Sequence, residues 1–112
     1  MISTRQIRAY IAKNGKCYYE EWIDALTTET RNRIMYEVNK LMFGLGFQKD
    51  LKQKLWVLKI DNGPGYRVYF YHESSELILL LAGSLKKNQQ RTIALCRKLI
   101  TEIEEDKKLK KG

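Results

Sequence analysis

The sequence has 112 residues, enough for one domain whose hydrophobic core needs no disulfide or metal support. It carries 21 Lys and Arg against 13 Asp and Glu, and this net charge of +8 favours an acidic partner such as nucleic acid. The apolar run at residues 77–82 is too short to span a membrane, and the first residues lack the apolar block of a secretion signal. We therefore expect a soluble cytoplasmic protein in which Cys17 and Cys96 are reduced packing residues.

The first half of the chain predicts a strand followed by a helical hairpin. Residues 5–11 have the apolar content of a strand, and apolar residues recur at helical spacing over 18–26. Thr27 or Thr28 is a suitable cap for a second helix. The glycines at 44 and 46 should end that helix.

The second half predicts three antiparallel strands and a final helix. Residues 53–60 are rich in β-branched and aromatic side chains, and Asp-Asn-Gly-Pro-Gly at 61–65 cannot continue a ladder, so a hairpin is expected there. The apolar run that ends at residue 82 is typical of a strand covered on both faces. The last helix is expected to start at Ser84 or Asn88.

This order of elements predicts an α+β domain over residues 1–106, followed by a basic flexible tail at 107–112. The helices are expected to pack on one face of a twisted antiparallel sheet. The other face should then remain partly open to solvent.

Arg67 is the strongest candidate for a functional side chain. Strand alternation places it on one sheet face together with Tyr69 and Tyr71, and we expect this to be the open face. An outward guanidinium can hold two phosphate oxygens while a neighbouring aromatic ring stacks on a base. The alternative is an exposed arginine that only covers the sheet.

Further cations are predicted to gather near Arg67. Lys59 lies on the strand that enters the hairpin, so antiparallel pairing brings it close, and Lys86 and Lys87 follow the apolar strand at the sheet rim. The candidate catalytic residues are Arg67, Lys59, Lys86 and Lys87, and the candidate substrate-binding residues are Tyr69, Tyr71, His72, Gln89 and Arg91. Solvated lysines on a strand and a loop, a solvated histidine, and capping by Gln89 and Arg91 are the structural alternatives. No cluster has metal-ligand spacing, so we expect neither metal nor cofactor.

Four segments resemble one known group of proteins. They are Asn-Gly-Lys at 14–16, Glu-Trp-Ile-Asp-Ala-Leu at 21–26, Gly-Pro-Gly-Tyr-Arg-Val-Tyr-Phe at 63–70 and Ala-Gly-Ser-Leu-Lys-Lys-Asn-Gln at 82–89. Together the chain resembles, to about Ile103, the RelE/ParE toxin superfamily and its HigB-like branch of addiction-module killer proteins. The resemblance implies a RelE-like fold with an N-terminal strand, a helical hairpin, an antiparallel sheet and a C-terminal helix.

The same resemblance implies the toxin of a type II toxin–antitoxin module, a ribosome-dependent and metal-independent endoribonuclease that cleaves mRNA and inhibits translation. Its implied partners are a cognate helix-turn-helix antitoxin and mRNA on the ribosome. Arg67 matches the arginine after Gly-Tyr, whereas Ile93 stands where RelE has a helix tyrosine, and Lys59 and Thr92 replace the more usual arginine and aspartate. A ParE-like inhibitor of DNA gyrase, or an RNA-binding relic with weak catalysis, is the alternative.

Overall fold

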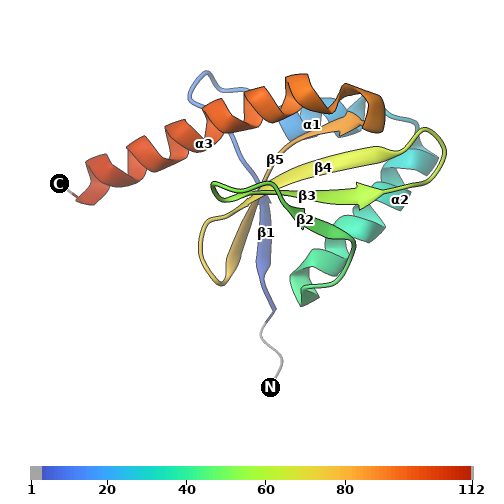
Figure 1. Ribbon diagram of the computed structural model, residues 1–112, viewed down its shortest axis with the longest axis horizontal. Coiled ribbons are helices and arrows are strands. Elements are labelled where there is room, and N and C mark those ends of the chain that lie inside the picture. Colours follow the sequence, from blue (N-terminus) through green and yellow to red (C-terminus); the bar gives the residue numbers. More distant parts are fainter. Residues whose placement is uncertain (1–3, 112) are drawn as a thin grey trace.

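The computed structural model describes residues 4–111 and has an α+β fold built on a five-stranded mixed sheet (Figure 1). In chain order the elements are β1 (Gln6–Ala9), α1 (Tyr18–Asp24), α2 (Thr28–Lys40), β2 (Gln48–Asp50), β3 (Leu55–Ile60), β4 (Tyr66–His72), β5 (Leu77–Leu85) and α3 (Gln89–Lys111), with short 3-10 turns at Leu41–Phe43 and Lys86–Asn88. The strand order is β1-β5-β4-β3-β2. Strand β1 runs parallel to β5, and every other neighbouring pair is antiparallel.

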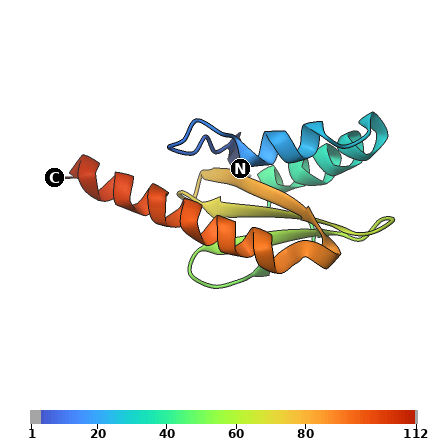
Figure 2. The same cartoon turned by 90° about the horizontal axis from the view of Figure 1, so that it is seen from above.

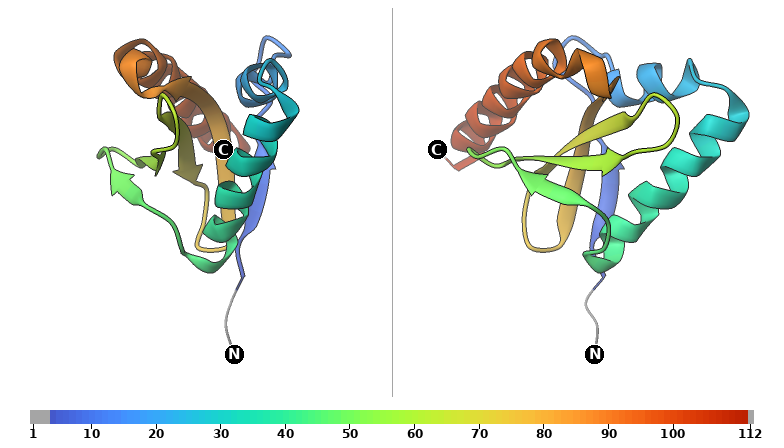
Figure 3. Two further views of the ribbon diagram at one scale, coloured as in Figure 1. Left: turned by 90° about the vertical axis from the view of Figure 1, so that its right-hand side faces the viewer. Right: turned by 45° about the vertical axis from the view of Figure 1, so that its right-hand side comes forward.

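Helices cover both faces of the sheet. Figures 2 and 3 show α1 and α2 on one face and the long α3 on the other. Each interface has its own core: Ile23, Ile34, Val38, Val68 and Phe70 belong to the α1–α2 side, whereas Val57, Tyr69, Tyr71, Cys96, Leu99 and Ile103 belong to the α3 side. The prediction of helices on one face and an open second face is therefore wrong. Strand β4 is apolar or aromatic on both sides, and each side must be buried.

The predicted hairpin is confirmed. Strand β3 ends at Ile60 and β4 begins at Tyr66, so the connection has the expected five residues. Gly63 and Gly65 adopt φ values of 56° and 81°, a region that favours glycine. The helical hairpin is also confirmed, because Thr27 Oγ1 accepts a hydrogen bond from the Thr30 backbone and caps α2.

Two features of the sheet differ from the prediction. The first strand is shorter than expected and pairs in parallel with β5, so the sheet is mixed and not wholly antiparallel. Strand β2 was not predicted, because its three residues, Gln-Lys-Asp, carry no apolar alternation. It pairs with β3 and extends the sheet beyond the hairpin.

The prediction of a flexible tail is also wrong for residues 107–111, which continue α3. Gly112 lies outside the described residues, as do residues 1–3. The side chain of Lys107 lies against the sheet, where its Nζ donates to Tyr71 Oη at 3.1 Å and pairs with a Glu73 carboxylate oxygen at 3.0 Å. The lysine-rich segment 107–111 is helical because these contacts with the sheet hold its first residue in place. Within residues 4–111, no helix has the length and apolar character needed to cross a bilayer.

Candidate functional site

Three side chains from adjacent strands form a row at the hairpin end of the sheet. Lys59 on β3 lies directly opposite Arg67 on β4, and Arg67 lies opposite Ser84 on β5. Residues opposite each other in an antiparallel pair direct their side chains to the same face. The predicted juxtaposition of Lys59 and Arg67 is therefore confirmed.

Lys86 joins this row through the backbone of the hairpin. Its N–H donates to the Gly65 carbonyl at 3.0 Å. A Cβ added at Gly65 would lie 3.0 Å from the Lys86 Cβ, so only glycine lets the turn approach this closely. The chain leaving β5 is thus fixed against the start of β4, beside Arg67.

Arg67 itself is buried, which corrects the expectation of an outward guanidinium. Its side chain is 4% exposed, and its Nη1 donates to Asp61 Oδ1 at 2.8 Å and to the Tyr66 carbonyl at 3.0 Å. Its Nε is buried and has no hydrogen-bond partner among residues 4–111. The expectation was wrong because α3 covers the sheet face on which Tyr69 lies. A side chain on that face of β4, such as that of Arg67, therefore lies beneath the helix.

Asp61 is the residue that the sequence analysis missed. Its side chain is 67% exposed, and it lies at the first position of the hairpin connection. The hydrogen bond from Arg67 lowers the pKa of this carboxyl, and the nearby charges of Lys86 and Lys59 act in the same direction. Arg67 contacts the carboxylate directly and the two lysines act on it through their charges, so an anion is favoured at this position. An acidic residue in a turn six positions before a key arginine was the available signal.

The two tyrosines proposed to stack on bases are core residues. Tyr69 is 0% exposed and Tyr71 is 1% exposed, so neither ring is accessible to a base. The Tyr69 hydroxyl lies 3.2 Å from Ser84 Oγ, and burial raises its pKa. Their assignment to substrate binding is wrong, because α3 packs on the surface that was expected to be open.

His72 is also not part of the site. It lies at the far end of β4 and packs edge-on against Trp56 and Phe70, with ring centroids 5.3 Å and 5.5 Å away. These neighbours belong to the α1–α2 side of the sheet, opposite Arg67. Burial lowers the pKa of His72 and so disfavours the charged form of the ring. Its assignment to substrate binding is wrong.

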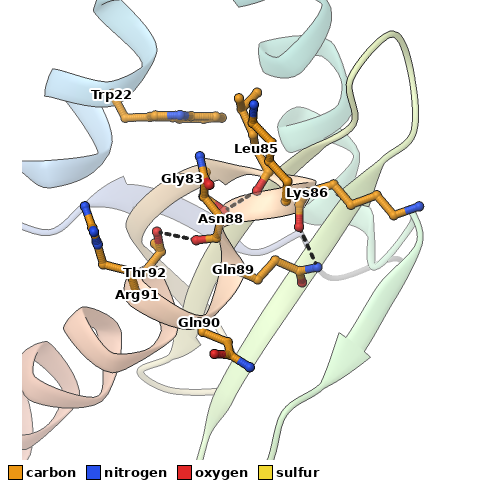
Figure 4. Close-up of a pocket in the computed structure, with 11 residues that line it drawn as sticks. Trp22, Gly83, Leu85, Lys86, Asn88, Gln89, Gln90, Arg91 and Thr92 are labelled. Atoms are coloured by element: carbon orange, nitrogen blue, oxygen red, sulfur yellow. Dashed lines mark hydrogen bonds between the residues drawn. The ribbon is translucent and has the colours of Figure 1, made fainter.

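A pocket of about 810 Å³ gathers the remaining predicted residues where β5 turns into α3. Figure 4 shows Trp22, Lys86, Gln89 and Arg91 around it, together with the backbone of Gly83. The indole ring lies on that backbone, since a Cβ at Gly83 would fall 2.1 Å from a Trp22 ring carbon.

The basic side chains at this pocket point in different directions. In Figure 4, Lys86 extends away from Trp22, whereas Arg91 lies on the Trp22 side. Lys87 and Arg91 are exposed. Gln89 Nε2 donates to the Lys86 carbonyl at 2.9 Å. Gln89 thus braces the turn, which is the structural role given above as the alternative to substrate binding.

The predicted cations thus divide into two neighbouring groups. Arg67, Lys59 and Lys86 lie at the hairpin end of the sheet, while Lys87 and Arg91 line the pocket beyond Lys86. Within residues 4–111, no group of three or more His, Cys, Asp or Glu side chains is placed to hold a metal ion.

Comparison with known proteins gives one informative relative. No family model matches the sequence. An uncharacterized protein of Haemophilus influenzae strain Rd is 30% identical over 87 residues, which cover 76% of this chain and 88% of the relative. At that identity and coverage, the chain belongs to the same protein family as this Haemophilus influenzae protein.

Proposed function

We propose that the protein binds the phosphate backbone of RNA at the hairpin site and acts as a metal-independent endoribonuclease toxin. The observation that carries this proposal is the placement of three cations at the hairpin end of the sheet: Arg67 already holds one anionic group, Lys59 lies opposite it, and Lys86 is bonded to the turn before β4. Sites that recognise phosphate combine a bidentate arginine with additional point charges in this way. The net charge of +8 adds general attraction for a polyanion.

The chemistry that such a site can support is cleavage by the RNA itself. The ribose 2′-hydroxyl loses its proton to a base as its oxygen attacks the adjacent phosphorus, the bond from phosphorus to the 5′-oxygen breaks, and that oxygen takes up a proton. The products are a 2′,3′-cyclic phosphate and a 5′-hydroxyl. Negative charge grows on the non-bridging oxygens during the attack, and Arg67 with Lys86 would stabilise it. Lys59 supplies a third charge, and a lysine is the group available to transfer a proton.

The pocket beside Lys86 gives the RNA a path away from the scissile phosphate. Arg91 and Lys87 are the exposed cations there, and each suits contact with a neighbouring phosphate. Sequence-independent contacts of this kind fit a nuclease whose register on the message is set elsewhere, on the ribosome.

The order of elements supports placing the chain with the RelE/ParE toxins and their HigB-like branch. A strand, a helical hairpin, antiparallel strands and a C-terminal helix follow one another as the resemblance implies. Under this proposal the protein acts in the cytoplasm, and a cognate helix-turn-helix antitoxin blocks the basic end of the sheet.

Inhibition of DNA gyrase without cleavage is the second candidate. The observation that favours it is the ion pair of Arg67, because a guanidinium already bonded to Asp61 is not free to hold a scissile phosphate. A ParE-like protein needs no such phosphate. RNA binding with weak catalysis is the third outcome that the experiment below separates.

Pulsed expression in a bacterial host tests these alternatives. We expect growth arrest within minutes and new 5′ ends within translated messages, detected by primer extension, and we expect Lys86→Met to weaken both effects. Lys98→Met is the matched control, because Lys98 is an exposed lysine on α3 outside the pocket. DNA damage with intact messages would support gyrase as the target, and normal growth with intact messages would contradict the toxin proposal.

A further inference from the structure

We propose that the Asp61 carboxylate is a displaceable counter-anion, occupying on Arg67 the position that an RNA phosphate takes when it binds. The inference deepens the proposed function, and its RNA form rests on that function. The free protein would then hold its phosphate site closed with its own side chain, and ligand binding would exchange one anion for another.

The first supporting observation is the unequal burial of the two partners. Arg67 is 4% exposed, whereas Asp61 is 67% exposed, and their atoms are 2.8 Å apart. A buried charge requires a partner, so Arg67 cannot remain without an anion. An exposed carboxylate recovers its hydration when it leaves, so Asp61 loses little by giving way.

The second observation is that contacts other than Asp61 also hold Arg67 in place. Its Nη1 also donates to the Tyr66 carbonyl at 3.0 Å, and β4 fixes its Cα between Lys59 and Ser84. The guanidinium is therefore anchored by the strand. Rotation of the Asp61 side chain breaks no sheet hydrogen bond, because the strand ends at Ile60.

The third observation is a buried donor that the present arrangement does not use. Arg67 Nε is buried and has no hydrogen-bond partner in the described part of the chain, although most buried polar groups have one. A carboxylate reaching only Nη1 leaves this donor unpaired. A phosphate at the Asp61 position has more acceptor oxygens than a carboxylate, so it can bridge the two terminal nitrogens of the guanidinium, Nη1 and Nη2, and the unpaired Nε leaves the group with capacity for a stronger anionic partner.

The surrounding charges favour this exchange over a role of Asp61 as general base. Arg67, Lys86 and Lys59 all lower the pKa of the carboxyl, so it is a weak proton acceptor at neutral pH. The same three cations attract any anion that replaces it. The more highly charged phosphate gains more from them than a single carboxylate does.

Binding of a single-stranded RNA oligonucleotide to Asp61→Asn tests the proposal. Removing the competing carboxylate should tighten binding on the order of 5- to 10-fold relative to the wild-type protein. Asp106→Asn is the matched control, because it makes the same charge change on α3 beside Lys110, at the far end of the molecule from the hairpin (Figure 1). We expect that control to change affinity by less than about 2-fold.

Equal effects of the two substitutions would overturn the proposal, because only general charge would then matter. Weaker binding by Asp61→Asn would also overturn it, since Asp61 would then help to hold the ligand. Asp61→Ser should reproduce the gain. Thermal unfolding of each variant confirms that it is folded at the assay temperature.

Titration with inorganic phosphate makes the test independent of nuclease activity. The Arg67 Nε–H resonance in a ¹⁵N–¹H spectrum should shift on adding phosphate, at a several-fold lower concentration in Asp61→Asn than in the wild-type protein. If the protein cleaves no RNA but Asp61→Asn still binds phosphate more tightly, the toxin proposal is wrong and the counter-anion role of Asp61 holds. If the protein cleaves RNA but Asp61→Asn binds phosphate no more tightly than the wild-type protein, only the counter-anion role is wrong.

Discussion

Helix α3 covers a sheet face that has a cation near each end, and the two cations are bonded in different ways. At one end, Lys107 donates to the Tyr71 hydroxyl, the Glu73 carbonyl and the Glu73 carboxylate. At the other end, Arg67 donates to one carboxylate and one carbonyl, and its Nε has no partner within the residues that the structure describes. A side chain that only stabilises the fold can use all its donors within the protein. A side chain that still has unused donors is better placed to bind a ligand.

The aromatic centre between these two ends should show the largest effect on stability. We expect Tyr69→Ala to lower the free energy of unfolding by about 3 to 5 kcal/mol, because it removes a fully buried aromatic ring. Tyr69→Phe, which loses only the contact with Ser84, should cost about 1 kcal/mol. Urea denaturation measures both values. A Tyr69→Ala variant of nearly wild-type stability would mean that the ring is not in the core.

The contact between Gly83 on β5 and Trp22 on α1 should show the next largest effect on stability. Gly83→Ala puts a methyl group 2.1 Å from the Trp22 ring, so the indole has to move. We expect a loss of about 1 to 3 kcal/mol and a change in tryptophan fluorescence. An unchanged emission spectrum with full stability would show that the ring does not rest on this glycine.

Replacing Arg67 or Lys107 with methionine should have different effects on RNA affinity and on stability. Arg67→Met should weaken RNA binding by at least about 10-fold, while the exposed Asp61 returns to water. Lys107→Met should cost about 1 kcal/mol of stability and leave RNA affinity within about 2-fold. Denaturation and fluorescence anisotropy measure the two effects. If both variants lost the same amount of RNA binding, the distinction between the two ends would be lost.

The smallest expected effect is that of an exposed ion pair near the Lys107 end. Lys54 hydrogen-bonds Glu104 at 2.8 Å and lowers the pKa of that carboxyl. A carboxyl whose pKa is lowered by folding stabilises the folded state fully at pH values above its unfolded pKa of 4.5. This contribution is lost as the pH falls through the lower pKa of the folded state. Glu104→Gln should therefore cost about 0.2 to 1 kcal/mol at pH 7 and less at pH 3. An equal cost at both pH values would exclude the ion pair as its source.

The sequence predicted the hairpin, the helical pair and the meeting of Lys59 with Arg67, because turn residues and strand alternation act locally. It did not predict the burial of Arg67, which depends on where a helix some twenty residues later packs. Apolar residues on both faces of β4 were the missed signal: Tyr69 and Tyr71 were interpreted as a binding surface, although aromatic rings beside an amphipathic helix are more often core. The partner Asp61 was missed because a turn was considered only for its geometry.

The salt dependence of RNA binding tests most directly whether the hairpin cations contact the phosphate backbone. The affinity of a single-stranded RNA is measured at several salt concentrations for the wild-type protein, for Lys59→Met/Lys86→Met and for the control Lys98→Met/Lys108→Met. Each lost phosphate contact should reduce the slope of log affinity against log salt by about 0.7 to 1. We expect a clearly shallower slope for the hairpin pair than for the control pair, and equal slopes would mean that the hairpin lysines do not contact the phosphate backbone.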